Sequence, residues 1–234
     1  MIEAIILAGG FGTRLQPVLK NLPKPMADVH GRPFLAYLLD YLAVQHVSRV
    51  ILSVGYQNER ISDYFKNTYK GISLKYAVES EPLGTGGALL NALSMATTDN
   101  VFVLNGDTYF PIPLDDFLEF HKTKKSLLSI ALKTVEDVSR YGCIICGSHG
   151  CITGIAEKGL SGAGTINAGI YLVDASEIKK LDLPIKFSLE KDVMENMFNK
   201  KRFFGKPFDA YFIDIGVPED YFRFIENKQE RIGI

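Results

Sequence analysis

The first half of the chain alternates short apolar runs of strand length with stretches in which apolar residues recur at helical spacing. Runs of strand character lie at positions 2–7, 50–54, 74–78 and 101–104. Helical spacing is found at positions 35–42, 61–65 and 89–93. Pro33 suits the first turn of the first of these helices. Because strands separated by helices need crossover connections, this order predicts a doubly wound, largely parallel sheet.

The second half has a different rhythm, in which strands follow one another with few helices between them. The expected strands lie at positions 126–132, 141–146, 151–156, 166–173 and 210–213, and the expected helices at 189–198 and 219–227. No linker rich in proline, serine or charge separates the two halves. We therefore expect one compact α/β domain over residues 1–234, with a Rossmann-like, mixed but mainly parallel sheet flanked by helices.

The 234 residues carry a formal net charge of −1, which gives no broad attraction to nucleic acid or to a membrane surface. A few well-placed cations would still suffice to bind an anionic substrate. No apolar run approaches the roughly 18 residues that a membrane-spanning helix needs. The N-terminal run reads as a strand that stops at Gly9 and Gly10, because no basic residues precede it as they would in a signal peptide. The expected location is the cytoplasm.

Three cysteines and a histidine fall close together at Cys143, Cys146, His149 and Cys151, a spacing that superficially resembles a zinc site. The same stretch reads as a β-hairpin, and positions 143 and 146 of a strand point to opposite faces unless a bulge intervenes. We therefore expect three reduced, mostly buried thiols and no zinc.

A glycine-rich segment directly follows the first predicted strand, with the sequence Leu7-Ala-Gly-Gly-Phe-Gly-Thr-Arg-Leu15. Its glycines allow backbone N–H groups to crowd around an anion. The segment lacks the Gly-Lys-Ser/Thr of a P-loop, and Leu15 stands where a dinucleotide fingerprint has its third glycine. Tight turns also use glycine for steric reasons alone. Arg14 favours a phosphate ligand, because a guanidinium fork matches phosphate oxygens.

Lys24 lies between Pro23 and Pro25, so its backbone is stiff and its ammonium group has a defined direction. A lone loop lysine is usually just solvated. This loop, however, follows the first strand, at the edge where parallel sheets bind their ligands.

Two aspartates, Asp107 and Asp214, each follow the end of a predicted strand. Either carboxylate alone could simply cap a turn. If both face one polyphosphate pocket, they supply the oxygen ligands that Mg²⁺ prefers, with phosphate oxygens and water completing its coordination.

Taken together, these segments resemble the sugar-1-phosphate nucleotidyltransferase family over nearly the whole chain. The matching segments are residues 9–15, 23–25, 79–87, 105–107, 141–142, 157–158, 167–169 and 214–216. The resemblance implies a nucleotide-binding half, to about residue 125, and a sugar-binding half, from about residue 126. It also implies in-line attack by a sugar 1-phosphate on the α-phosphorus of a nucleoside triphosphate. The nucleophile is already an anion, so no general base is required.

The same resemblance implies roles for individual residues. Arg14 would steady the β- and γ-phosphates, and Lys24 would bridge the attacking phosphate and the α-phosphoryl group. Asp107 and Asp214 would carry Mg²⁺. The nucleotide would be bound by Leu7, Ala8, Gly9, Gly10, Gly12, Thr13, Glu79, Pro82, Gly84, Thr85 and Gly106. The sugar phosphate would be bound by Gly142, Glu157, Lys158, Asn167 and Glu190, with Lys158 holding the phosphate.

The chain departs from the family pattern at two places. Gly159 follows the Glu157-Lys158 pair where the family commonly has proline, and Val18 and Leu19 stand where a threonine is often found. These differences bear on the loop contacts and leave the expected reaction unchanged.

Within the family, the chain most resembles the enzymes that use GTP and D-glycero-α-D-manno-heptose 1-phosphate, which makes GTP the expected nucleotide. Glu79 gives an independent hint, because an ionised carboxylate only accepts hydrogen bonds. Guanine offers two adjacent donors, whereas uracil and thymine place carbonyls beside their single N–H. The alternative is that Glu79 simply faces solvent. Mannose-1-phosphate guanylyltransferases and the uridylyl-, thymidylyl- and cytidylyltransferases of the family are the alternative activities.

Glu190 and Asp192 either help to fix the sugar or are exposed acids in the first turn of a helix capped by Ser188. Two rival functions also stay open. A non-catalytic regulator that binds nucleotide sugars would be expected to have lost the arginine, lysine or aspartates. A metal-dependent glycosyltransferase would be expected to carry Asp-x-Asp, where this chain has Asn105-Gly106-Asp107. The sequence leaves the formation of homo-oligomers open.

Overall fold

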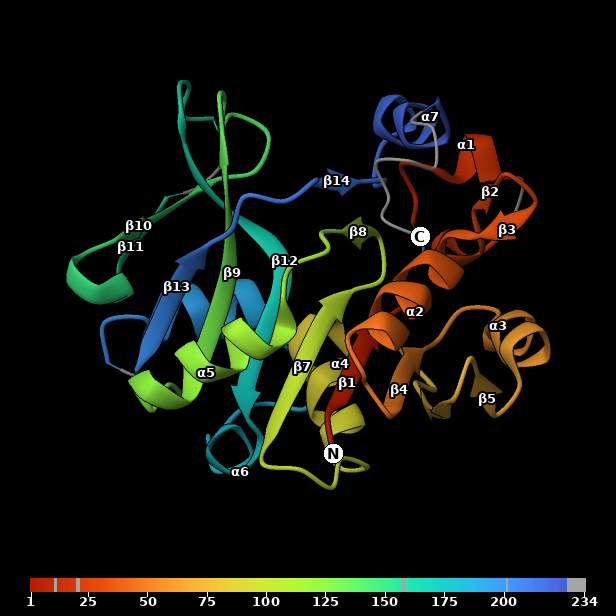
Figure 1. Cartoon of the computed structure of the whole chain (residues 1–234), viewed down its shortest axis with the longest axis horizontal. Helices are drawn as coiled ribbons and strands as arrows, with labels where there is room; N and C mark the ends of the chain where they lie inside the picture. Colours follow the sequence, from red (N-terminus) through yellow and green to blue (C-terminus); the bar gives the residue numbers. More distant parts are fainter. Residues whose placement is uncertain (11, 20–21, 157–158, 201, 227–234) are drawn as a thin grey trace.

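The computed structural model describes residues 1–10, 12–19, 22–156, 159–200 and 202–226. Its centre is an eight-stranded sheet with the order β13-β9-β12-β7-β1-β4-β6-β5 (Figure 1). The strands of this sheet are β1 (Glu3–Leu7), β4 (Arg49–Val54), β5 (Thr68–Tyr69), β6 (Ile72–Val78), β7 (Asn100–Asn105), β9 (Leu128–Val135), β12 (Gly164–Asp174) and β13 (Phe203–Pro207).

Most neighbouring strands of the sheet are parallel. β1 pairs in parallel with β4 and β7, β4 with β6, and β9 with β13. Only β12 and β5 run against the others, because β12 is antiparallel to both β7 and β9, and β5 is antiparallel to β6. The predicted mixed, mainly parallel sheet is therefore confirmed, and β9, β12 and β13 extend it without a break.

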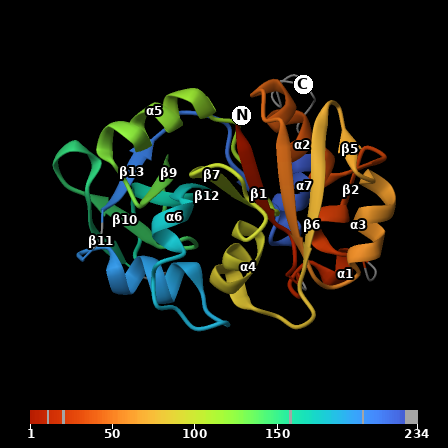
Figure 2. The ribbon, with the colours of Figure 1, turned by 90° about the horizontal axis from the view of Figure 1, so that it is seen from below.

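Helices cover both faces of the sheet (Figure 2). One face packs against α2 (Phe34–Val44), α5 (Leu114–Lys124) and α7 (Pro218–Glu226). The other face packs against α4 (Gly84–Leu93), α6 (Ala175–Ile178) and the π-helix η3 (Leu189–Glu195). Alternation along β1 serves both layers, because Ala4 and Ile6 join the first core and Ile5 joins the second.

Short elements complete the described chain. They are α1 (Gln16–Leu19), the 3-10 helix η1 (Lys24–Met26), α3 (Asn58–Phe65), the 3-10 helix η2 (Ser148–Gly150), and the two-stranded pairs β2 (Asp28–Val29) with β3 (Arg32–Pro33), β8 (Thr108–Tyr109) with β14 (Ile213–Asp214), and β10 (Cys143–Cys146) with β11 (Ile152–Ala156). None of the helices in the described part of the chain has the length and apolar character needed to span a lipid bilayer.

The structure corrects several expectations. Helix α5 and strand β13 are not foreseen, and the strand expected at 210–213 is reduced to β14. Pro33 precedes α2 as its N-cap residue instead of forming its first turn. The predicted end of the last helix at position 227 lies outside the described residues. In α5 the pattern is hard to read, because its buried positions are Leu114, Phe117 and a histidine, His121.

The three thiols are less buried than expected. Cys146 and Cys151 are exposed and Cys143 is half-buried. The reason is that the β10–β11 hairpin lies outside the eight-stranded sheet and contacts it only in part. The register of the hairpin also shifts between Ile145 and Cys146, so the simple alternation assumed for positions 143 and 146 does not hold.

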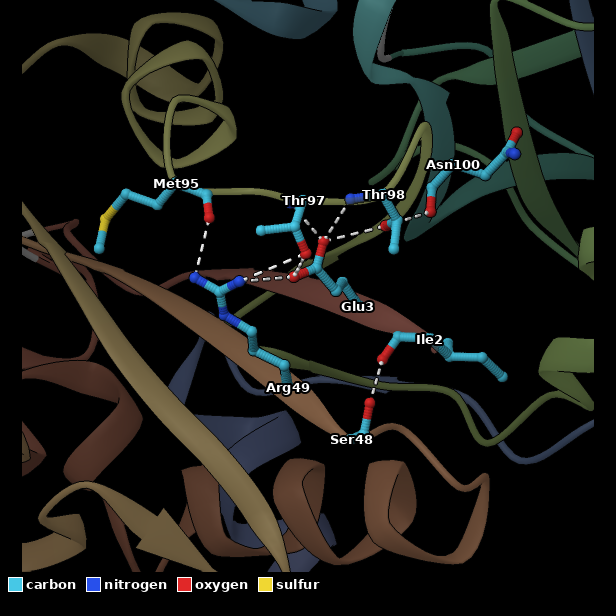
Figure 3. Close-up of polar contacts among 8 residues, drawn as sticks. All are labelled: Ile2, Glu3, Ser48, Arg49, Met95, Thr97, Thr98 and Asn100. Carbon is cyan, nitrogen blue, oxygen red and sulfur yellow. Dashed lines mark hydrogen bonds and ion pairs between the residues drawn. The ribbon is translucent and has the colours of Figure 1, made fainter.

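A buried carboxylate joins three segments at the N-terminal edge of the sheet (Figure 3). Glu3 Oε2 accepts hydrogen bonds from the backbone N–H groups of Thr97 at 2.7 Å and Thr98 at 2.8 Å, and Arg49 donates to Glu3 Oε1 at 2.9 Å. Burial acts to raise the pKa of Glu3, but the hydrogen bonds from Thr97 and Thr98 outweigh it and hold the pKa below the ordinary value. This cluster ties β1 and β4 to the loop that leads into β7.

Candidate functional site

A cavity of about 300 Å³ opens at the C-terminal ends of β1 and β7 and reaches the start of α4. It is lined by Leu7, Ala8, Gly9, Gly10, Gly12, Lys24, Pro25, Glu79, Pro82, Gly84, Thr85, Ala88, Asn105, Gly106 and Asp107. Every residue predicted to bind nucleotide is in this set except Thr13, which is exposed. We call this space the first cavity.

The strand ends around the first cavity approach each other closely. The N–H of Gly106 donates to the carbonyl oxygen of Leu7 at 2.9 Å, and a Cβ on Gly106 would lie 2.7 Å from that oxygen. Glycine is therefore needed at position 106 for β7 to end against β1. The next residue, Asp107, is placed beside the glycine-rich loop as a result.

Lys24 packs over the glycine-rich loop and meets the first acid. Gly12 has a φ of +60°, and a Cβ there would lie 3.1 Å from Lys24 Cβ. The Lys24 ammonium donates to Asp107 Oδ2 at 2.8 Å, and the lysine side chain is only 13% exposed. Lys24 is thus held inside the cavity, as its flanking prolines predict, and is not a solvated loop lysine.

The second acid reaches the same place through the pairing of β14 with β8, in which Asp214 lies opposite Thr108. The N–H of Ile215 donates to the backbone oxygen of Asp107 at 2.9 Å. Burial and the charge of Asp107 raise the pKa of Asp214 to about 6, although the Gly216 N–H, Lys24 and Arg14 oppose the rise. Because the charge of Asp107 opposes the ionisation of Asp214, a cation between the two carboxylates would be favoured.

Within the described residues, no group of three or more histidine, cysteine or acidic side chains is arranged to hold a metal. Asp107 and Asp214 are a pair only, and a cation between them would need further ligands. Phosphate oxygens and water are the ligands with which Mg²⁺ completes such sites. The arrangement therefore fits a cation that arrives with a polyphosphate. Arg14 is exposed on the loop, near enough to Asp214 to affect its pKa.

Glu79 follows β6, and its carboxylate lines the first cavity, so it does not simply face solvent. Ser53, fully buried on β4, donates its hydroxyl to Glu79 Oε1 at 3.2 Å. The N–H of Leu83 donates to Glu79 Oε2 at 3.1 Å. Each oxygen is thus fixed by one donor and keeps a lone pair for a ligand in the cavity.

A second cavity, of about 560 Å³, is built from the other half of the chain. It is lined by Tyr141, Gly142, Cys143, Ile144, Ile155, Ala156, Asn167, Ser188, Glu190, Lys191, Met194 and Glu195. Three of the residues predicted to bind the sugar phosphate, Gly142, Asn167 and Glu190, are among them. The other two, Glu157 and Lys158, lie outside the described residues.

The sequence leaves the same two interpretations open for Glu190 and Asp192, and the structure shows that the two side chains are placed differently. Asp192 Oδ2 accepts the N–H of Ser188 at 2.7 Å, and the Ser188 hydroxyl accepts the N–H of Lys191 at 3.2 Å. These bonds form the capping arrangement at the start of η3, so Asp192 belongs to the helix end. Glu190 instead lines the second cavity.

The two cavities meet where α4 and η3 begin. The Thr85 hydroxyl donates to Glu190 Oε2 at 2.6 Å and accepts the N–H of Leu189 at 2.9 Å. A Cβ on Gly86 would overlap the ring of Phe187, so the glycines after Thr85 let the two helix starts touch.

Several lining residues were not assigned from the sequence. Asn105 lies in the 105–107 segment but has no role predicted from the sequence, Pro25 follows Lys24, and Ala88 follows the 79–87 segment. Ser53 sits inside a plain apolar strand, and no local signal marks it. Its contact with Glu79 depends on the pairing of β4 with β6.

Comparisons with known proteins bear on this geometry. A family model described as nucleotidyl transferase matches residues 3–231. A D-glycero-alpha-D-manno-heptose 1-phosphate guanylyltransferase from Aneurinibacillus thermoaerophilus is 46% identical over 220 residues, covering 94% of this chain and 95% of the relative. The enzyme of the same name from Campylobacter jejuni is 42% identical over 227 residues, covering 97% of this chain and 100% of the relative. The crystal structure of HddC from Yersinia pseudotuberculosis complexed with GMP-PN matches with a TM-score of 0.85 and 39% identity, covering 97% of this chain and 99% of HddC.

Proposed function

The chain belongs to the nucleotidyl transferase family, and we propose that it transfers a guanylyl group from GTP to D-glycero-α-D-manno-heptose 1-phosphate. The products are GDP-heptose and pyrophosphate. The observation that carries the proposal is the meeting of Lys24, Asp107 and Asp214 at the edge of the glycine-lined first cavity. The choice of heptose and of guanine rests on the two relatives that share more than 40% of their residues with this chain.

The division of the chain supports two substrates. The first cavity is lined by residues 7–107 and the second by residues 141–195. We assign the nucleotide to the half that ends near residue 125 and the sugar phosphate to the half that begins near residue 126. In the second cavity Gly142, Asn167 and Glu190 would contact sugar hydroxyls, together with Glu157, while Lys158 would hold the phosphate.

The reaction is an in-line displacement. An oxygen of the sugar phosphate forms a bond to the α-phosphorus of GTP, and the bond from that phosphorus to the oxygen leading to the β-phosphorus breaks. The electron pair of the broken bond leaves with pyrophosphate. The attacking oxygen is already ionised, so no side chain has to remove a proton.

The residues of the site would act by positioning the two substrates and by offsetting the charge of their phosphates. Backbone N–H groups of the loop after β1 would surround the triphosphate, and Arg14 would meet the charge that grows on pyrophosphate. Lys24 would lie between the attacking phosphate and the α-phosphoryl group, holding the two anions together. Asp107 and Asp214 would hold Mg²⁺, which when bound neutralises phosphate charge.

Glu79 supplies the guanine preference. Its two oxygens are oriented by Ser53 and Leu83 and can accept the two adjacent donors of guanine. The reaction is assigned to the cytoplasm, whose reducing conditions suit the three free cysteines.

A pyrophosphate-release assay tests the proposal. Four nucleoside triphosphates are combined with heptose, mannose and glucose 1-phosphates, each with Mg²⁺ and with a chelator. The expected result is the highest kcat/KM for GTP with the heptose phosphate. A higher kcat/KM with mannose 1-phosphate would show that mannose 1-phosphate is the sugar substrate, and the proposed type of reaction would be unchanged. Nucleotide binding without any pyrophosphate release would favour the non-catalytic regulator, which the presence of Arg14, Lys24 and both aspartates argues against.

A further inference from the structure

Tyr171 lies on β12, and its side chain is fully buried. Its hydroxyl oxygen accepts a hydrogen bond from Asn167 Nδ2 at 2.8 Å and another from the side chain of Asn105. It also lies 3.4 Å from Glu190 Oε1. Asn105 lines the first cavity, whereas Asn167 and Glu190 line the second. One hydroxyl group therefore touches side chains from both cavities.

The direction of each hydrogen bond follows from the groups involved. Asn167 Oδ1 accepts the N–H of Gly169 at 3.0 Å, which turns the Asn167 amide nitrogen towards Tyr171. A tyrosine oxygen has two lone pairs, and the two asparagine amides occupy both. The remaining option for the Tyr171 proton is Glu190 Oε1. Burial and the neighbouring Glu190 raise the pKa of Tyr171 well above its ordinary value, so the hydroxyl keeps this proton.

Glu190 is held from its other side as well. Its Oε2 accepts the hydroxyls of Thr85 at 2.6 Å and Ser188 at 3.0 Å, which uses both lone pairs of that oxygen. Within the described residues, Oε1 accepts a hydrogen bond from Tyr171 alone and keeps one lone pair beside the second cavity. The carboxylate is thus fixed by donors on both sides and presents a single acceptor to a ligand.

We propose that Tyr171 is a positioning residue for sugar recognition, which rests on the proposed function. By donating to Glu190 and accepting from Asn167, its hydroxyl fixes Glu190 as an acceptor for one sugar hydroxyl and Asn167 in a single amide orientation. The hydrogen bond from Asn105 also connects Tyr171 to a residue that lines the first cavity. Tyr171 itself contacts no substrate.

The test is Tyr171→Phe, which removes the hydroxyl and keeps the ring. Its matched control is Tyr41→Phe. Tyr41 is also buried and donates its hydroxyl to the carbonyl oxygen of Ile112 at 2.7 Å, in the core on the opposite face of the sheet. Both changes remove one buried hydroxyl, so both lower the melting temperature. Only Tyr171→Phe is expected to change how the sugar phosphate is bound.

The measurements are KM for each substrate in pyrophosphate release, and sugar-phosphate affinity by calorimetric titration. Tyr171→Phe is expected to raise KM and Kd for the sugar phosphate about 10-fold or more, because the lost bond is to a charged group. KM for GTP should stay within about twofold, and Tyr41→Phe should leave both KM values unchanged.

The failure of the inference can be told apart from the failure of the proposed function. If the wild-type protein is active and Tyr171→Phe leaves the sugar-phosphate KM and Kd unchanged, or raises the KM of both substrates equally, Tyr171 has a structural role only. If the wild-type protein releases no pyrophosphate with any sugar phosphate, the proposed function fails in the wild-type measurement, and the inference falls with it.

Discussion

A side chain at position 9 would collide with Glu79, because a Cβ built on Gly9 would lie 2.6 Å from Glu79 Oε1. The glycine-rich loop and the acid after β6 therefore share one small space at the end of the sheet. Gly9 leaves that space open to the carboxylate, and Ser53 and Leu83 hold the carboxylate there. In the proposed function, the preference for guanine would depend on this pairing.

Glu79→Gln is expected to shift nucleotide preference. The N–H of Leu83 can only donate, so it keeps the amide oxygen on its side and leaves the amide nitrogen near Ser53. That nitrogen would meet one of the donors of guanine, a mismatch that costs about 1–3 kcal/mol, or roughly 5–150-fold in kcat/KM for GTP. Relative kcat/KM for UTP or dTTP should rise, since an amide can donate to a carbonyl. Equal losses for all nucleotides, at one fixed sugar phosphate, would show that Glu79 only supports the loop.

Asp214→Asn is expected to stabilise the metal-free protein at neutral pH. The pKa of Asp214 is raised from 3.8 to about 6, so its ionisation opposes folding increasingly between these values and fully above them. Asparagine removes this effect and still accepts the Gly216 N–H. The expected gain at pH 7.5 is about 1–3 kcal/mol, with no gain near pH 3.5, measured by urea unfolding in a chelator.

Asp107→Asn is the matched control for this stability effect. It removes the negative charge that pairs with Lys24 at 2.8 Å, so its gain should be smaller. Both variants should lose most pyrophosphate-release activity at saturating Mg²⁺. A variant that keeps near-normal turnover would not have lost a metal ligand, and lower stability of Asp214→Asn at pH 7.5 would contradict the electrostatic account.

Lys24→Ala and Arg14→Ala are expected to lower kcat more than they raise KM. In the proposed reaction these side chains would meet a charge that grows during the transfer, and losing one such donor typically costs about 10²–10³-fold. Steady-state kinetics with varied GTP and varied sugar phosphate separates the two parameters. An effect confined to KM would mean that the residue binds the ground state only.

The parts of the site that the sequence predicts are those fixed by sheet topology. Gly9 follows β1 and Asp107 follows β7, and parallel neighbouring strands bring their C-terminal ends to one edge. Ser53 and Tyr171 escape prediction, because each reads as one more residue of a buried strand. Their roles arise from contacts such as that between Tyr171 and Glu190, which depend on how β12 and η3 pack.

Errors in the predicted fold have similar causes. Helix α5 buries His121, whose Nδ1 lies 2.8 Å from the hydroxyl of Ser129, so a polar pair takes a position where the pattern demands an apolar residue. Burial lowers the pKa of His121 to about 4, which keeps the ring neutral inside the core. The exposure of Cys146 and Cys151 follows from the placement of their hairpin outside the main sheet, which spacing alone does not reveal.

Glu3→Gln is expected to weaken the fold without altering the site, because Glu3 lies at the N-terminal edge of the sheet and the first cavity opens at the other edge. A glutamine would turn its oxygen to the N–H groups of Thr97 and Thr98 and its amide nitrogen to the Arg49 guanidinium, leaving donors face to face (Figure 3). The expected loss at pH 7 is about 1–3 kcal/mol in urea unfolding. Since the pKa of Glu3 is lowered from 4.5, its contribution is present above that value and is lost as the pH falls through the folded-state pKa. The difference in unfolding free energy from wild type should therefore shrink in acid.

Ser48→Ala, which removes an exposed hydroxyl bonded to the Ile2 carbonyl at the same edge, is the control and should change stability by no more than about 0.5 kcal/mol. A pH-independent loss for Glu3→Gln would show that packing, and not the ionised carboxylate, stabilises this edge.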